Sequence, residues 1–145
     1  MKTIYFLTII FLLTLPNIKA QCTHPDYAGL MELYSSTGGA NWTNNTGWKE
    51  GAAGINCEPC NGWFGIKCNQ LNRVIEISLI DNQLTGTIPN LLNISQLQTF
   101  RISFNQISGG IPDFSKLPNM RTFFCANNQL EGSIPNFTNL PNLNE

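Results

Sequence analysis

The second half of this 145-residue chain repeats itself every 23 residues. The phrases NQLTGTIP, NQISGGIP and NQLEGSIP begin at Asn82, Asn105 and Asn128. A unit of this length cannot bury an apolar face alone, so successive units must stack as coils that share one core. The repeat therefore predicts an α/β solenoid, with these inward columns: Val74, Leu97, Met120 and Leu143; Ile77, Phe100 and Phe123; Leu79, Ile102 and Cys125; Leu84, Ile107 and Leu130; Ile88, Ile111 and Ile134.

Each repeat also predicts its own local structure. The alternation around Ile77 and Leu79 favours a short parallel strand that points alternate residues into the core. The repeated Asn is expected to point inward, where its amide can bond the backbone of the bend. Ile88 precedes Pro89, which favours an extended path over a helix on the convex side.

The pattern L-x-x-L-x-L-x-x-N-x-L with this period is that of the leucine-rich repeat. The stretches YAGLMELYSSTGGANWTNNTGW, CNGWFGIKC and NRVIEISL resemble the N-terminal cap of plant-type leucine-rich-repeat proteins, and the L-x-G-x-I-P phrases resemble their repeats. The resemblance covers residues 22–142. It implies a right-handed coil with short parallel strands on its concave face and a disulfide-stapled, helical N-terminal cap.

The cap and the repeats divide the chain into consecutive segments. Tyr27, Leu30, Met31 and Tyr34 have helical spacing ahead of a Gly-Gly pair, which predicts a short amphipathic helix. We expect a signal peptide at 1–20, a cap at 21–72, repeats at 73–96, 97–119 and 120–142, and the start of a fourth repeat at 143–145. Such an end indicates either a fragment of a longer protein, which we favour, or a short solenoid that covers its last coil by self-association.

The first residues indicate the compartment. The apolar run from Ile4 to Leu15 is shorter than the roughly 20 residues of a spanning helix, and Ala20 offers a cleavage site. A secreted or extracellular protein is therefore expected, with no later segment long enough to span a membrane. Glycan acceptors are predicted where N-x-Ser/Thr sequons begin, at Asn41, Asn44, Asn93 and Asn136.

Four of the five cysteines precede residue 70, and an oxidising compartment favours two disulfides among Cys22, Cys57, Cys60 and Cys68. Three pairings are possible. We favour Cys60 with Cys68, which closes a short loop around a Trp, and Cys22 with Cys57. A redox Cys-x-x-Cys motif and a zinc site that adds His24 are the weaker alternatives.

The remaining cysteine, Cys125, occupies an inward column of the repeats. Its counterparts there are Leu79 and Ile102. Free cysteine behaves as a small hydrophobic residue. A buried free thiol is therefore expected.

Charge and motif content exclude several function classes. Eight basic and nine acidic residues provide no basic patch for nucleic acid. His24 is expected to be a solvated residue near the terminus, and the carboxylates Glu76 and Asp81 to serve solubility. Without a recognisable catalytic constellation, we expect no enzyme, no cofactor and no metal.

Outward strand positions supply the candidate site. Arg101, Phe104 and Phe124 are expected to cluster on the concave face, with Ser78 and Thr122 beside them. Arginine and aromatic residues dominate binding hot spots, although single exposed apolar residues are also ordinary. Three strands offer on the order of 200 Å², well below the roughly 800 Å² of a standard interface, so binding should be weak.

Together these observations predict that the protein is a non-enzymatic recognition module that binds a protein, peptide or glycan partner. The resemblance implies two alternatives, the ectodomain of a receptor-like kinase and a secreted inhibitor of cell-wall hydrolases of the polygalacturonase-inhibitor kind. A purely structural or surface-coat protein is a third hypothesis.

Overall fold

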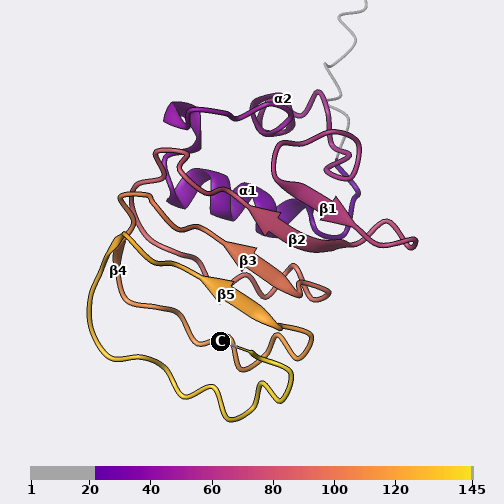
Figure 1. Ribbon diagram of the computed structural model, residues 1–145. Coiled ribbons are helices and arrows are strands. Elements are labelled where there is room, and N and C mark those ends of the chain that lie inside the picture. The colour runs from indigo at the N-terminus through magenta and orange to yellow at the C-terminus, as the bar shows by residue number, and fades with distance from the viewer. Residues whose placement is uncertain (1–21, 145) are drawn as a thin grey trace, which may run out of the picture.

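A computed structural model describes residues 22–144 of the chain. Coils of chain are stacked from a helical cap at one end to the C-terminal coil at the other (Figure 1). The predicted signal peptide at 1–20 lies outside the described residues.

The cap is built from two short helices and one turn of 3₁₀ helix. These are α1 (Tyr27–Ser36), η1 (Gly39–Asn41) and α2 (Trp48–Ala52). Helix α1 confirms the predicted helix, and Gly38 follows it with a left-handed φ of 69°. Its fully buried side chains are Leu30 and Leu33, whereas the remaining residues of the predicted apolar face stay half-buried.

The main sheet has four strands in the order β1-β2-β3-β5. The three repeat strands pair in parallel and in register, as the 23-residue period predicts. No repeat or spacing signal in the sequence predicts β1, a cap strand that pairs antiparallel with the first repeat strand. The strands are β1 (Ile66–Cys68), β2 (Val74–Ser78), β3 (Thr99–Arg101) and β5 (Thr122–Phe124).

A second, smaller sheet follows the bends after the main strands. β4 (Ser108–Gly109) and β6 (Gln129–Leu130) pair in parallel, and Thr87 extends the row through a bridge to Ser108. The backbone N–H of Thr87 in turn donates to the carbonyl of Ser36, at the end of α1, at 3.2 Å. The extended path predicted at Ile88 and Pro89 is confirmed, because no helix forms there. The α-helices α1 and α2 both belong to the cap.

Asparagine amides hold the coils together at the bend after each strand. Asn105 accepts hydrogen bonds from the backbone N–H groups of Asn82 and Leu84, at 3.0 and 2.9 Å. Its amide nitrogen donates to the Leu79 carbonyl one coil back, at 2.8 Å. Asn128 repeats the arrangement by accepting from Ile107. The inward asparagine ladder is therefore confirmed, because it satisfies turn backbone that no strand reaches.

Two disulfides close the cap in the favoured pairing. Cys22 bonds Cys57 and Cys60 bonds Cys68, with Cα–Cα distances of 5.1 and 5.6 Å. The pairing uses every thiol on which the redox and zinc alternatives depend. Within residues 22–144, no group of three or more metal-ligating residues is found.

No helix in the part of the chain that the structure describes is long and apolar enough to cross a bilayer.

Candidate binding surface on the strand face

The outward side chains of the main sheet form two rows, which we call the strand face. Strand pairing places Lys67 beside Glu76, and continues each row across the parallel strands. Because parallel strands in register align equivalent positions, the parts of the rows on the three repeat strands follow directly from the 23-residue repeat. The first row is Lys67, Glu76, Thr99 and Thr122, and the second is Ser78, Arg101 and Phe124.

Glu76 is the centre of the charged contacts on this face. Its carboxylate accepts from Lys67 Nζ at 3.0 Å and from Arg101 Nη1 at 2.6 Å. The Arg101 guanidinium carbon also lies 5.9 Å from the centroid of the Phe124 ring. Four strands thus contribute to one connected line of side chains that runs across the sheet.

The energies of these contacts differ. The Lys67 side chain is 70% exposed, so its ion pair is screened by water and adds little to stability. Glu76 and Arg101 are only 17% and 33% exposed, so their contact holds the guanidinium more firmly. A guanidinium has five N–H donors, and those not used on Glu76 can meet a ligand. The main effect of Glu76 is therefore to orient Arg101.

The predicted site residues are brought together only in part. Arg101 and Phe124 are in contact, and Ser78 and Thr122 lie half-buried in the two rows. Phe104 was expected to join them, but it lies in the turn after β3 with a φ of 60° and is 58% exposed. Among the described residues, its ring has no aromatic contact with Phe124 and no cation–π contact with Arg101. The departure of the chain from the strand at this turn separates it from the cluster.

Two residues of the strand face were missed by the sequence analysis. Lys67 was missed because it lies on a strand outside the repeat, which no periodic signal marks. Glu76 was assigned to solubility, although it forms two ion pairs. An acidic residue placed before an Arg on the next repeat strand was the available signal, since aligned strands bring such pairs within reach.

A second polar cluster joins the cap to the first coil. Asp26 has no exposed surface, and its carboxylate accepts from Arg73 Nη2, Arg73 Nε and the backbone N–H of Val74. The hydrogen bond to Asp26 raises the pKa of Arg73. With all its bonds directed within the fold, this cluster has the character of a structural clamp.

His24 belongs to the same joint and corrects the expectation that it is solvated. Its side chain is 7% exposed, Nδ1 accepts from the Asp26 backbone N–H, and Nε2 lies 2.8 Å from the Asn72 carbonyl. These bonds tie the segment before α1 to the turn before β2 and keep the ring buried.

Cys125 also differs from expectation. It is a free cysteine, as predicted, but it is half-buried where full burial was expected. No following coil covers this column among the described residues. Partial burial raises the pKa of its thiol.

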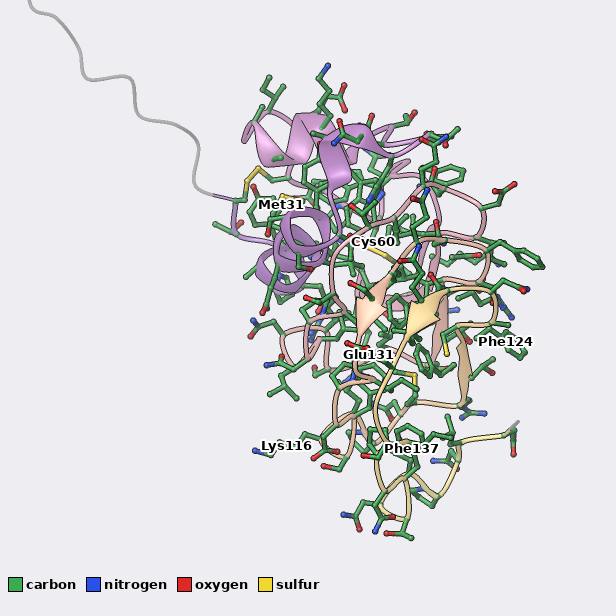
Figure 2. All side chains as sticks on the ribbon, turned by 90° about the vertical axis from the view of Figure 1, so that its left-hand side faces the viewer. Met31, Cys60, Lys116, Phe124, Glu131 and Phe137 are labelled. Carbon is green, nitrogen blue, oxygen red and sulfur yellow. A yellow bond between two sulfur atoms is a disulfide. The ribbon has the colours of Figure 1, made fainter. Side chains whose placement is uncertain are left out.

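Figure 2 shows where these residues lie on the molecule. Phe124 lies on one side of the stacked coils, and Lys116 lies on the opposite side. The strand face is therefore a separate surface from the returning segments, by which we mean the parts of the repeats, such as that with Lys116, that lead from one strand back to the next.

Comparisons with known proteins agree with this architecture. The family described as Leucine Rich Repeat matches residues 96–117. No curated protein matches the sequence. Among solved structures, the chain is 31% identical to the BIR2 ectodomain of Arabidopsis thaliana, with a TM-score of 0.70, and the match covers 82% of this chain and 64% of that one.

Two further structures are similar. A chain of the BIR3–SERK2 complex of Arabidopsis thaliana is 35% identical with a TM-score of 0.55, and covers 60% of this chain and 49% of its own length. Pollen Receptor Kinase 3 is 33% identical with a TM-score of 0.63, and the shares are 79% and 54%. The chain thus spans about half to two thirds of each solved chain. The repeat, the cap and these likenesses together support a plant-type leucine-rich-repeat protein.

Proposed function

We propose that this chain is a non-enzymatic, extracellular recognition module that binds a protein or peptide partner through its strand face. The observation that carries the proposal is the pre-oriented Arg101 beside the Phe124 ring. An Arg held in one rotamer loses less conformational entropy on binding than a free one. A 43% exposed Phe124 ring next to that cation offers apolar contact in the same place.

The organisation proposed with it is a right-handed solenoid whose strand face is concave. Its repeats would be 73–96, 97–119 and 120–142, with a fourth beginning at 143. A right-handed path is the rule for connections between parallel strands. In support of the fourth repeat, the Asn144 N–H donates to the Arg121 carbonyl, as Arg121 does to Gln98 one coil earlier.

The chemistry of the strand face suggests the class of partner. Arg101 has unused donors beside an aromatic ring, which suits a carboxylate next to an apolar side chain. A peptide segment carrying Asp or Glu beside a Leu or Phe would satisfy both. The BIR3–SERK2 complex is an assembly of two proteins, and its likeness to this chain favours a protein partner over a glycan.

The experiment is a peptide selection followed by a matched comparison. A random peptide library is selected on the whole chain, and the peptides recovered are measured against two double variants. Arg101→Ala with Phe124→Ser removes the strand-face pair. Lys116→Ala with Leu92→Ser removes one cation and one exposed apolar residue from the returning segments.

We expect acidic peptides that bind the strand-face variant at least about tenfold more weakly, which is about 1.4 kcal/mol. The control variant should bind as the unaltered chain does. Peptides that bind both variants equally well would refute the proposal. A glycan array screened in parallel tests the remaining partner class, since a glycan that is lost only from the strand-face variant would replace the peptide.

The likeness to the BIR2 ectodomain and to Pollen Receptor Kinase 3 favours a second candidate, the ectodomain of a receptor-like kinase. Sequencing the transcript beyond Glu145 tests it, because a receptor would continue into further coils, a membrane span and a kinase. The hydrolase-inhibitor alternative is tested by adding the chain to purified polygalacturonase, where unchanged hydrolysis excludes it.

A further inference from the structure

The cap contains an apolar groove that the proposed function does not use. It is an open groove of about 600 Å³, within the roughly 300–1,000 Å³ typical of small-molecule sites. One wall is a face of α1, and the other is formed by η1 and the end of α2. Figure 2 places Met31 among the cap helices, at the opposite end of the molecule from Phe137. The groove is lined by Tyr27, Met31, Tyr34, Ser35, Ala40, Asn41 and Ala52, with Gly38 and Gly39.

The aromatic wall of the groove is rigid. Tyr34 packs edge-on against Trp42 at a centroid distance of 5.3 Å and stacks on Trp48 at 6.4 Å. The Tyr27 hydroxyl donates to the Gly51 carbonyl at 2.8 Å. Gly39 packs so closely on the Tyr34 ring that an added Cβ would clash with it. The two rings are therefore fixed in place before any ligand arrives.

Asn41 lies at the rim of this groove and is also the first residue of the sequon Asn41-Trp42-Thr43. Its side chain is exposed, as is that of Thr43. Of the four sequon asparagines, Asn41 is the one that lines the groove. We propose that the groove holds the first sugars of an N-linked glycan carried by Asn41.

The groove has the chemistry that such a sugar needs. The C–H side of a pyranose ring is apolar and packs on the face of an aromatic ring, whose electron-rich face attracts positively polarised edges. Tyr27 and Tyr34 both line the groove and contribute aromatic surface to it, and the Met31 thioether adapts its shape to an acetyl methyl group. Ser35 and Asn41 supply polar groups at the rim for the sugar hydroxyls. Covalent attachment keeps the sugar near the groove at a high effective concentration.

The other sequons lack this combination. Asn44 is half-buried and lies outside the groove lining. Asn136 is exposed in the third repeat and also lies outside the lining. Asn93 is exposed in the first repeat and lies outside the groove lining, so it supplies the matched control.

The test begins with the whole chain secreted from a eukaryotic host. Glycopeptide mass spectrometry measures the occupancy of Asn41 and Asn93, and an endoglycosidase then trims each glycan to one N-acetylglucosamine. Nuclear Overhauser contacts between sugar protons and aromatic protons report whether the groove is filled. We expect contacts from the Asn41 sugar to Tyr27 and Tyr34, with its protons shifted upfield by the rings.

Two variants remove the same sugar differently. Asn41→Gln removes the acceptor, and Thr43→Ala removes the sequon while leaving Asn41. Both should abolish the contacts and lower the Tm of the trimmed glycoprotein by about 2–4 °C. Neither should change the Tm of protein made in bacteria, which lack this modification, and Asn93→Gln should leave the contacts intact.

Three results would overturn the proposal. In the first, Asn41 is unmodified in secreted protein while Asn93 is occupied. In the second, the Asn41 sugar has the chemical shifts of the solvated Asn93 sugar. In the third, the variants change the Tm of the unglycosylated chain as much as that of the glycoprotein.

Discussion

The two ends of the stacked coils treat the same repeat positions differently. At the cap end, Ile88 is 7% exposed, whereas its counterpart in the third repeat, Ile134, is 76% exposed. The same change occurs along other columns, where full burial in the first two repeats gives way to partial burial in the third. These columns are Ile77, Phe100 and Phe123; Leu79, Ile102 and Cys125; and Leu84, Ile107 and Leu130.

The difference shows that, along these columns, an inward position is fully buried where a neighbouring layer covers it. At the cap end that layer consists of α1, the tryptophans, two disulfides and the Asp26 clamp. At the other end, the described residues leave the column ends open. Stability should therefore depend on which end of a column is altered, although the residue type is similar.

The largest contrast is expected within the aromatic column. Phe100 has no exposed surface and packs against Phe114 and Phe123. Phe100→Ala should lower the free energy of unfolding by about 3–5 kcal/mol, because it leaves a cavity. Phe123→Ala, at the half-buried end, should cost about 1–2 kcal/mol. Urea denaturation of both variants measures the difference, and equal losses would show that the two ends are alike.

The Asp26 clamp is expected to come next. Asp26→Ala removes the buried partner of Arg73 and leaves the Val74 N–H without its acceptor. Loss of one member of a buried pair costs about 3–5 kcal/mol, and the partial exposure of Arg73 places this variant near 3. The control is Asp113→Ala, at an exposed carboxylate that bonds only Ser115 within its own turn. If urea denaturation shows that Asp26→Ala loses no more unfolding free energy than Asp113→Ala, the clamp does not stabilise the fold.

A pair of equivalent glycines tests the same contrast through the backbone. Gly86 and Gly132 have φ of 72° and 85°, so alanine is strained at both by about 1–2 kcal/mol. At Gly86 the new Cβ would also clash with the Ser36 carbonyl, whereas nothing lies within 4 Å at Gly132. Gly86→Ala should therefore cost about 1–3 kcal/mol more than Gly132→Ala. Thermal denaturation that ranks the two equally would contradict close packing of the cap on the first coil.

The smallest effect is expected at Cys125. Burial raises the pKa of its thiol, so the folded state favours the protonated form. Stability from this group is present below the ordinary thiol pKa and is lost as the pH rises through the higher folded value. Alkylation by iodoacetamide should therefore set in at a higher pH in the folded chain than in the unfolded one.

A second thiol makes the comparison direct. Ile102→Cys in a Cys125→Ser background places a cysteine at the fully buried position of the same column. That thiol should resist alkylation until the chain unfolds, whereas Cys125 should react in the native state. Alkylation of both at one rate would mean that the column is equally open along its length.

The strand face shows how far sequence reasoning reaches at a site. Arg101 and Phe124 were predicted together because the repeat aligns their positions on neighbouring strands. The tether from Arg101 to Glu76 was not predicted, since Glu76 was assigned to solubility. Phe104, predicted to join them, has a left-handed backbone conformation after the strand, which the repeat pattern does not report.

Residue spacing was enough to predict the coils, the inward columns, the asparagine ladder and the first cap helix. Each of these features follows from local spacing or from a period that aligns equivalent residues. Both signals can be read without knowing which distant segments are in contact. Residue spacing could not predict the pairing of β1 with β2, the burial of His24, the second sheet or the open column ends. These depend on segments that meet across the fold without a repeating signal, so only the packed chain reveals them.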